Sequence, residues 1–363
     1  MYRKIDVKTR IRSFEVNNEV MAYLDKDNQL IFNTKIVEKN YTDSLYKLDS
    51  KYLFFNQNKK GYIATYEYED LSVKSLPLFF ALSSIANGKG IAFFNFQEER
   101  KTWESGYFDL INNQKISSIS VENLSFSLFC QNDNFFFITI SRNNIFSIVK
   151  NTGKTVWQLD ITDLGRYRRN SQSPEEAGKV EKIIGVYNNL LIVTITNSTV
   201  LAIDIHTGAL KGKWRDLPEG QSYGKSKRTT LVYPFQSFID QTQGKLIGLI
   251  GSYYWEIDLY GDSIHLYDAT EEFDKHQVGT QTSGQITPQG EHIFFASEYI
   301  LPSAQRVQKV AAFNRSTKLI DWSYTFEDLA PMVMPKAPVI EGDRLYILDT
   351  GGTLHIFERK EVL

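Results

Sequence analysis

Short apolar runs separated by polar turns recur along the whole chain. The clearest example spans residues 188–214, NNLLIVTITNSTVLAIDIHTGALKGKW. In it, the β-branched run at 190–195 and the run at 200–204 are separated by polar residues, and the turn at 206–208 leads into a third run that ends at Trp214. The glycine of that turn is suited to a positive φ. Runs this short predict an antiparallel meander of β-strands.

Similar runs predict strands from one end of the chain to the other. They lie at residues 10–16, 20–25, 30–36, 52–56, 61–68, 91–96, 105–111, 135–140, 144–149, 246–251, 253–259, 263–267, 292–296, 309–314, 319–322, 344–349 and 353–357. The second strand of each hairpin begins near residues 20, 61, 105, 144, 199, 253, 309 and 353. A spacing of about 40 to 55 residues is that of a propeller blade.

One such meander is unable to bury its own faces, so copies of it must stack on one another. The fold class that we expect is therefore all-β, a β-propeller of eight blades with four-stranded antiparallel sheets, and seven blades remain an alternative. The last unit ends after its third strand. Residues 5–8 are expected to complete it, so that pairing of the N- and C-terminal strands closes the ring and removes its free edges. No linker composition interrupts residues 1–363, which predicts a single domain.

Composition and charge agree with a β-rich globular protein. Aromatic residues make up 13% of the 363 residues, and only 9 are proline. The net charge of −2 provides no overall field for nucleic acid, so nucleic-acid binding is not expected. No apolar run is long enough to span a bilayer or resembles a signal sequence, which predicts a cytoplasmic protein with no membrane association if Met1 is the true start. We also expect the protein to be monomeric. Abundant Asn, Lys, Ile and Phe suggest a bacterial source.

Three segments resemble a known repeat. They are VKNTGKTVW at 149–157, AIDIHTGALKGKW at 202–214 and AFNRSTKLIDW at 312–322. These segments are similar to the repeats of quinoprotein-dehydrogenase-like (PQQ-like) propellers, in which an LDxxTGxxxW pattern ends each blade. The resemblance implies that Trp157, Trp214 and Trp322 dock neighbouring blades together, although the threonine-to-tryptophan spacing is seven residues in the second segment and five in the others.

The catalytic features of that family are not found in this sequence. Its dehydrogenases resemble one another in having adjacent cysteines and a calcium site of Glu, Asn and Asp, whereas this chain has one cysteine, Cys130, which we expect to be a buried thiol. The resemblance therefore implies a non-catalytic member, with no cofactor. The five histidines have no metal-ligand spacing, and hydrolase, P-loop and metalloprotease motifs are absent. No catalytic, cofactor-binding or metal-binding residue is predicted.

Four long polar connections distinguish the later part of the chain. They span residues 163–180, 217–230, 271–284 and 327–336, whereas the first three units are joined by short connections. In a propeller such connections emerge on one face, and long loops on a rigid scaffold are common binding sites.

Two of these loops carry basic and aromatic residues together, which predicts a partner-binding patch. The predicted contacts are Arg166, Tyr167, Arg168, Arg169, Tyr223, Lys225, Lys227 and Arg228. Glu175, Glu176 and Glu219 lie nearby and neutralise part of the charge. The sequence thus favours a non-enzymatic scaffold for a protein partner, for example an inhibitor that caps an enzyme. The alternatives are solvated loops without a partner, and a small-ligand-binding or enzymatic propeller that uses its central channel.

Overall fold

The computed structural model describes most of the chain. The described residues are 2–17, 20–32, 35–38, 45–47, 52–57, 60–67, 70–76, 90–97, 102–109, 112, 114–121, 129–140, 142–168, 172–231, 234, 236–280, 286–303, 306–326 and 337–360. The chain divides into two compact units. We call Met1–Tyr41 with Asp216–Leu363 the discontinuous unit and Thr42–Arg215 the continuous unit.

The described residues of the discontinuous unit form four antiparallel sheets of four strands each. One has the order β2-β3-β4-β5, with bounds Ile11–Asn17, Val20–Asp25, Leu30–Phe32 and Lys35–Glu38. The next is β21-β22-β23-β24, with bounds Ser237–Asp240, Lys245–Ile250, Tyr253–Asp258 and Ile264–Asp268. The third is β25-β26-β27-β28, with bounds Ile286–Gln289, His292–Ile300, Arg306–Asn314 and Ile320–Phe326.

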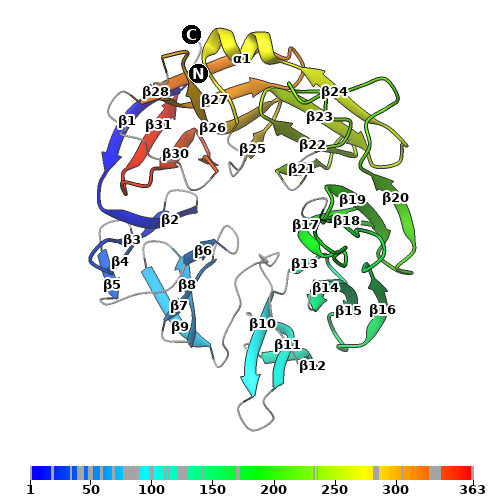
Figure 1. The fold of residues 1–363 in the computed structure, drawn as a ribbon. Coiled ribbons are helices and arrows are strands. Elements are labelled where there is room, and N and C mark those ends of the chain that lie inside the picture. The colour runs from blue at the N-terminus through cyan, green and yellow to red at the C-terminus, as the bar shows by residue number, and fades with distance from the viewer. Residues whose placement is uncertain are drawn as a thin grey trace. The chain divides into compact units, whose positions relative to one another are not determined.

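The fourth sheet of this unit joins the two ends of the chain. Its order is β1-β31-β30-β29, with bounds Tyr2–Lys8, Leu354–Arg359, Arg344–Leu348 and Val339–Glu341. Strands β1 and β31 lie side by side in Figure 1, and their register runs from Tyr2 opposite Arg359 to Lys8 opposite Leu354. The expected pairing of N- and C-terminal strands is therefore observed, and it extends from Tyr2 to Lys8 with an irregularity between Lys4 and Asp6, rather than over residues 5–8 alone.

The described residues of the continuous unit form four further sheets. The first is β6-β7-β8-β9, with bounds Leu45–Lys47, Tyr52–Gln57, Lys60–Glu67 and Asp70–Leu76. The second is β10-β11-β12, with bounds Gly90–Gln97, Thr102–Asp109 and Gln114–Val121. The remaining two are β13-β14-β15-β16, with bounds Phe129–Gln131, Phe135–Ile140, Asn144–Val149 and Thr155–Asp160, and β17-β18-β19-β20, with bounds Val180–Tyr187, Leu190–Ile195, Thr199–Asp204 and Leu210–Trp214.

The expected all-β class is confirmed, with differences of detail. The run at residues 30–36 is two paired strands, β4 and β5, rather than one. The short first strands of several sheets, including β6 and β13, were not predicted. Residues 77–89, between β9 and β10, lie outside the described residues, so the expectation of a short connection there stays a prediction.

A side-chain-capped turn joins the last two strands of the β17–β20 sheet. The Asp204 carboxylate accepts hydrogen bonds from the backbone N–H groups of His206 and Thr207, at 3.0 and 2.9 Å. The N–H of Gly208 then donates to the Asp204 carbonyl at 2.9 Å, with the glycine at φ +73°. An aspartate that closes the turn and a glycine with positive φ explain the local DxxTG pattern. In the equivalent turn of the β25–β28 sheet, Asn314 replaces the aspartate and Lys318 replaces the glycine, at φ +64°.

Tryptophans join sheets within each unit. The indole Nε1 of Trp157, on β16, donates to the Ile205 carbonyl of the next sheet at 2.7 Å, and the ring lies against Gly208. In the discontinuous unit, Trp322 Nε1 donates to the Tyr2 carbonyl at 3.0 Å. Docking between sheets is thus confirmed for Trp157 and Trp322. The ring of Trp214, whose spacing differs, lies against Gly212 of its own strand.

The helix α1 (Thr270–His276) is the one α-helix among the described residues, and the sequence analysis did not predict it. Its Phe273 is buried and stacks on Phe295, with ring centroids 5.6 Å apart. Glu272 Oε1 accepts the backbone N–H of Ile320 at 3.0 Å, which satisfies a donor of the edge strand β28. The helix therefore protects this edge from pairing with another strand. Among the described residues, no helix has the length and apolar character needed to cross a membrane.

Close packing in the β21–β24 sheet leads to a testable prediction. A Cβ atom at Gly248 would lie 2.4 Å from the ring of Trp255, which is fully buried. We expect Gly248→Ala to lower the free energy of unfolding by about 1–3 kcal/mol, because the ring must move in a packed core. Gly279→Ala is the matched control, since its Cβ would come no closer than 3.5 Å to another atom. Urea unfolding followed by circular dichroism measures both, and equal stabilities of the two variants would contradict the prediction.

Candidate functional site

The first loop of the predicted patch follows β16 in the continuous unit. Tyr167 and Glu176 exchange backbone hydrogen bonds at 3.2 and 2.8 Å, and the Tyr167 hydroxyl donates to the Glu176 carboxylate at 2.9 Å. At the base of the loop, the Thr196 hydroxyl donates to the Gly165 carbonyl at 2.8 Å. These contacts hold the described part of the loop as a short hairpin rather than as an unstructured segment.

Acidic neighbours offset part of the positive charge of this loop. Arg166 forms an ion pair with Asp163 at 2.6 Å and lies 3.7 Å from Glu175. The hydrogen bond to Asp163 and the negative charge of Asp163 raise the pKa of the exposed Arg166 guanidinium above its ordinary value. Arg168 is exposed, and Arg169 lies outside the described residues. The sequence-based expectation of partial neutralisation is therefore observed at Arg166.

The second loop of the predicted patch follows β20 and belongs to the discontinuous unit. Its stem is closed by backbone pairing between Asp216 and Thr230, and its tip by pairing between Tyr223 and Arg228. At the tip, the N–H of Tyr223 donates to the Arg228 carbonyl at 3.0 Å, and the reverse bond is 2.9 Å. We call residues 223–228 the cationic hairpin.

The cationic hairpin displays its charges on an aromatic support. Tyr223 is only 5% exposed, and its ring lies 5.1 Å from that of Tyr253. The Gly224 N–H donates to the Tyr253 hydroxyl at 3.1 Å. Lys225, Lys227 and Arg228 are all exposed at the tip. Tyr223 thus supports the hairpin from beneath, and the three cations face the solvent.

The two loops lie in different units. Arg166, Tyr167 and Arg168 are on the continuous unit, whereas Tyr223, Lys225, Lys227 and Arg228 are on the discontinuous unit. Their union in one patch stays a prediction, and each loop stands as a candidate contact surface of its own.

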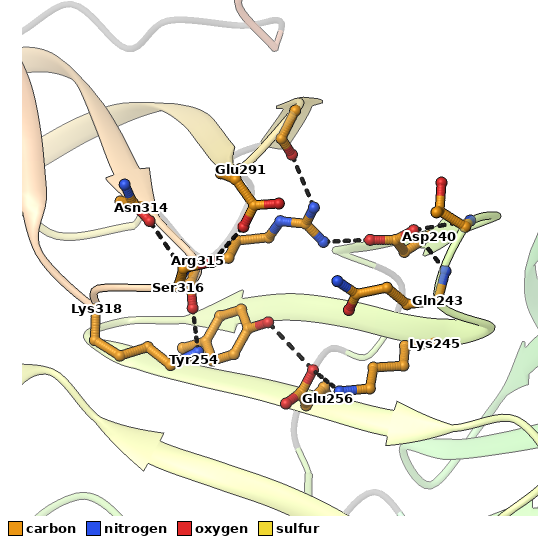
Figure 2. A network of polar contacts seen from close by, with 12 residues as sticks. Asp240, Gln243, Lys245, Tyr254, Glu256, Glu291, Asn314, Arg315, Ser316 and Lys318 are labelled. Carbon is orange, nitrogen blue, oxygen red and sulfur yellow. Dashed lines mark hydrogen bonds and ion pairs between the residues drawn. The ribbon is translucent and has the colours of Figure 1, made fainter.

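A polar network links the β21–β24 and β25–β28 sheets, and the sequence analysis did not single it out. Figure 2 shows Arg315 reaching from the end of β27 to Asp240, where the two side chains form an ion pair at 2.6 Å. Arg315 also donates to the Gly290 carbonyl at 2.8 Å. Both charged side chains are 9% exposed. Because the pair is buried and joins two sheets, its role is structural.

The same network contains a cation over an aromatic ring. The ammonium of Lys318 lies 3.8 Å from the centre of the Tyr254 ring, which belongs to the neighbouring sheet. Burial lowers the pKa of Lys318 and raises that of Tyr254. Such a contact contributes about 0.5–2 kcal/mol when it is partly desolvated. Lys318 therefore links the two sheets. It holds the positive-φ position of its turn, which Gly208 holds in the β17–β20 sheet.

A cavity of about 550 Å³ opens beside β28 in the discontinuous unit. Its lining includes Tyr2, Glu291, His292, Asp321 and Trp322. His292 Nε2 and Asp321 Oδ2 are 2.8 Å apart. The sequence offered no signal for this site, because its walls come from β1 and from the β25–β28 sheet, which are far apart in the chain. We call it the β28 cavity.

Metal ligation finds no support in the described part of the chain. No group of three His, Cys, Asp or Glu side chains there is placed to hold an ion. Cys130, the single cysteine of the chain, is half-buried against the apolar cluster of the continuous unit rather than fully buried.

Comparison with known proteins establishes the fold. No protein-family model matches the sequence, and no curated protein matches it. The chain is similar in structure to the C-terminal WD40 domain of Sif2, with 12% identity, a TM-score of 0.60 and 99% of each chain covered. WD40 repeats build β-propellers. The chain has the β-propeller fold.

Two further solved structures resemble this β-propeller. The computationally designed Ika8 protein is 9% identical, with a TM-score of 0.57 and 98% of each chain covered. BamB from Moraxella catarrhalis is 13% identical, with a TM-score of 0.44, and the match covers 87% of this chain and 96% of BamB. The fold rests on the Sif2 and Ika8 matches, and at these identities they show the fold alone. Membership of the PQQ-like family, the cytoplasmic location and the bacterial source stay predictions.

Proposed function

We propose that this β-propeller is a non-enzymatic scaffold that binds a protein partner through its long loops. In this proposal the eight sheets are eight blades, and the β1–β31 pairing closes the ring. The observation that carries the proposal is the cationic hairpin, in which three exposed cations stand on a hydrogen-bonded turn. A supported turn loses little conformational entropy on binding, so it is a better contact surface than an unstructured loop.

The charges of the hairpin indicate an acidic partner surface. Lys225, Lys227 and Arg228 lie within four residues, and the nearby loop acids Asp216 and Glu219 are fewer. Complementary charge speeds association and selects against basic surfaces. The loop after β16 is the second proposed contact, through Arg168, Arg169 and the outer part of Tyr167. Its Arg166 already has acidic partners, so it contributes less.

The test is affinity capture of a partner from lysate of the source cell with separate charge-reversal variants. The hairpin variant is Lys225→Glu with Arg228→Glu, which leaves Lys227 and its positive φ unchanged. The second variant is Arg168→Glu in the other loop. Lys211→Glu with Lys213→Glu is the matched control, because both lysines are exposed on the outer strand β20.

We expect a stoichiometric protein to be retained by the wild type and the control, and its recovery to fall at least about tenfold with the hairpin variant. Thermal melting by circular dichroism verifies that each variant is folded. Equal recovery with all four proteins, or no partner with any of them, would refute the loop proposal and turn attention to a ligand in the central channel.

A further inference from the structure

A buried histidine lies between two sheets of the discontinuous unit. His355 is on β31, in the β1-β31-β30-β29 sheet, which we call the terminal sheet. It is only 5% exposed, and its ring centroid lies 4.8 Å from that of Phe326, on β28 of the neighbouring sheet. Val7 of β1 is directly opposite it in the register. His355 therefore lies both at the β1–β31 pairing and at the contact between the two sheets.

The two nitrogens of this imidazole have unequal surroundings. Nε2 lies 2.8 Å from Asp349 Oδ2, and the Asp349 side chain is 1% exposed. Nδ1 is buried and has no hydrogen-bond partner among the described residues. The neutral ring fits this setting, because Nε2–H donates to the carboxylate and Nδ1 carries no proton. A protonated ring would place a second N–H donor in the contact without an acceptor.

The described residues of the β25–β28 sheet do not supply that acceptor. Phe326 belongs to the apolar cluster that the two sheets share, and Gln308 of β27 is opposite it in the register. Gln308 is 2% exposed, and its amide donates to Glu298 at 3.0 Å. Its Oε1 is buried and, like Nδ1 of the histidine, has no partner in the described part of the chain. A proton on Nδ1 is therefore not balanced from this side.

Charge and burial act on the imidazole in opposite directions. Burial is the strongest influence and lowers the pKa of His355, while the hydrogen bond and charge of Asp349 raise it and the charge of Lys4 lowers it. On the neighbouring sheet, Glu298 and Arg306 offset each other in an ion pair at 2.9 Å. Because burial prevails, the pKa of His355 lies below its ordinary value.

We propose that His355 is an acid-sensitive switch that controls the packing of the terminal sheet on the β25–β28 sheet. At neutral pH the ring is uncharged and packs against Phe326. When the contact opens, water becomes a partner for both nitrogens, so the open form takes up a proton more readily than the closed form. The closed form is therefore fully favoured above about pH 6.5 and loses stability as the pH falls below that value. Neither loop of the proposed scaffold surface takes part in this contact.

The test is hydrogen exchange, measured by mass spectrometry on the wild-type chain at about pH 7.5 and about pH 5.5 and corrected for the intrinsic effect of pH on exchange. We expect the protection of the backbone amides in Tyr2–Lys8 and Leu354–Arg359 to fall at least about threefold at the lower pH. The amides of Lys245–Ile250, in another sheet of the same unit, should keep their protection.

A variant separates His355 from the other titrating groups. His355→Gln keeps an N–H donor for Asp349 and gains no charge in acid, so the acid-induced loss of protection should disappear. His265→Gln is the matched control, because His265 is exposed on β24. This control should lose protection in acid as the wild type does.

An NMR titration of the wild type with labelled histidine needs no variant at the buried position. The His355 signal is assigned through its contact with the Phe326 ring. We expect its pKa to lie below about 6.5. This measurement decides the proposal even if His355→Gln does not fold.

Four results would overturn the proposal. They are a His355 pKa at or above about 6.5, no loss of protection in the wild type, the same loss in the wild type and His355→Gln, and an equal loss in Lys245–Ile250. The last result would indicate unfolding of the whole unit instead of a local opening. None of them depends on a protein partner, so they are distinguishable from a failure of the scaffold proposal.

Discussion

Replacing Trp157 with alanine is expected to lower the free energy of unfolding of the continuous unit by about 3–5 kcal/mol. The indole is 8% exposed and packs within the apolar cluster shared by the β13–β16 and β17–β20 sheets. Its loss removes that packing and leaves the Ile205 carbonyl without its 2.7 Å hydrogen bond. The ring also covers Gly208, so the turn it shields becomes exposed.

Urea unfolding followed by far-ultraviolet circular dichroism measures the loss without relying on tryptophan fluorescence. The matched control is Val156→Ala on the same strand, because Val156 is 41% exposed and points away from the cluster. The control should lose less than about 1 kcal/mol. A similarly small loss for Trp157→Ala would show that the indole does not hold the two sheets together.

Arg315→Met is expected to destabilise the discontinuous unit by about 3–5 kcal/mol at neutral pH. The substitution keeps the length of the side chain but leaves the Asp240 carboxylate in a buried position without its 2.6 Å partner. It also removes the hydrogen bond to the Gly290 carbonyl. Adding Asp240→Asn should recover part of the loss, because the unpaired charge is then gone.

Arg306→Met is the control for this pair. Arg306 also bonds a carboxylate, Glu298, at 2.9 Å, but its side chain is 52% exposed. An ion pair in that setting contributes about 0–1 kcal/mol, so the control should be nearly as stable as the wild type. Equal losses for the two arginine variants would contradict a special role of the buried pair.

The buried pair also predicts a dependence on pH. Burial alone would raise the pKa of Asp240. Its hydrogen bonds outweigh burial and, with the positive charge of Arg315, hold the pKa below its ordinary value; the donors are Arg315 and the backbone N–H groups of Gln243 and Thr242. A carboxyl group whose folded pKa is depressed contributes stability at neutral pH that is lost as the pH falls through that pKa. The stability difference between the wild type and Arg315→Met should therefore narrow below about pH 4.

Much of the sheet structure could be predicted from the sequence, because the strands concerned are apolar on both faces. The run at 190–195 is buried at every position, and it was recognisable without any tertiary information. Strands such as Leu45–Lys47 and Val339–Glu341 are three residues long, which is too short for a periodic pattern to appear. Their pairing depends on the neighbouring strand rather than on their own sequence.

The helix α1 escaped prediction for a similar reason. Residues 270–276, TEEFDKH, carry one apolar side chain, and helices of this length are marginal without tertiary contacts. The contact that fixes it is Phe273 on Phe295, which the local sequence does not reveal.

The candidate sites, too, could be predicted from the sequence only in part. The cations of the two loops were visible in the sequence, since charged runs in long polar connections are a local feature. The burial of Tyr223 could not be predicted from the sequence, because it depends on contact with Tyr253 of the following sheet. The β28 cavity was invisible as well, since Tyr2 and Trp322 meet only after the chain ends have paired.

The pairing of β1 with β31 sets an order of events during synthesis. The strand at Tyr2–Lys8 must wait for its partner at Leu354–Arg359 until the whole Thr42–Arg215 unit, which lies between them in the chain, has been synthesised. At about 5–20 residues per second, this delay is on the order of tens of seconds. The Thr42–Arg215 unit is complete in the meantime, whereas the first strand waits with an unpaired edge. The nascent chain thus carries an unpaired strand edge until Leu354–Arg359 has been made.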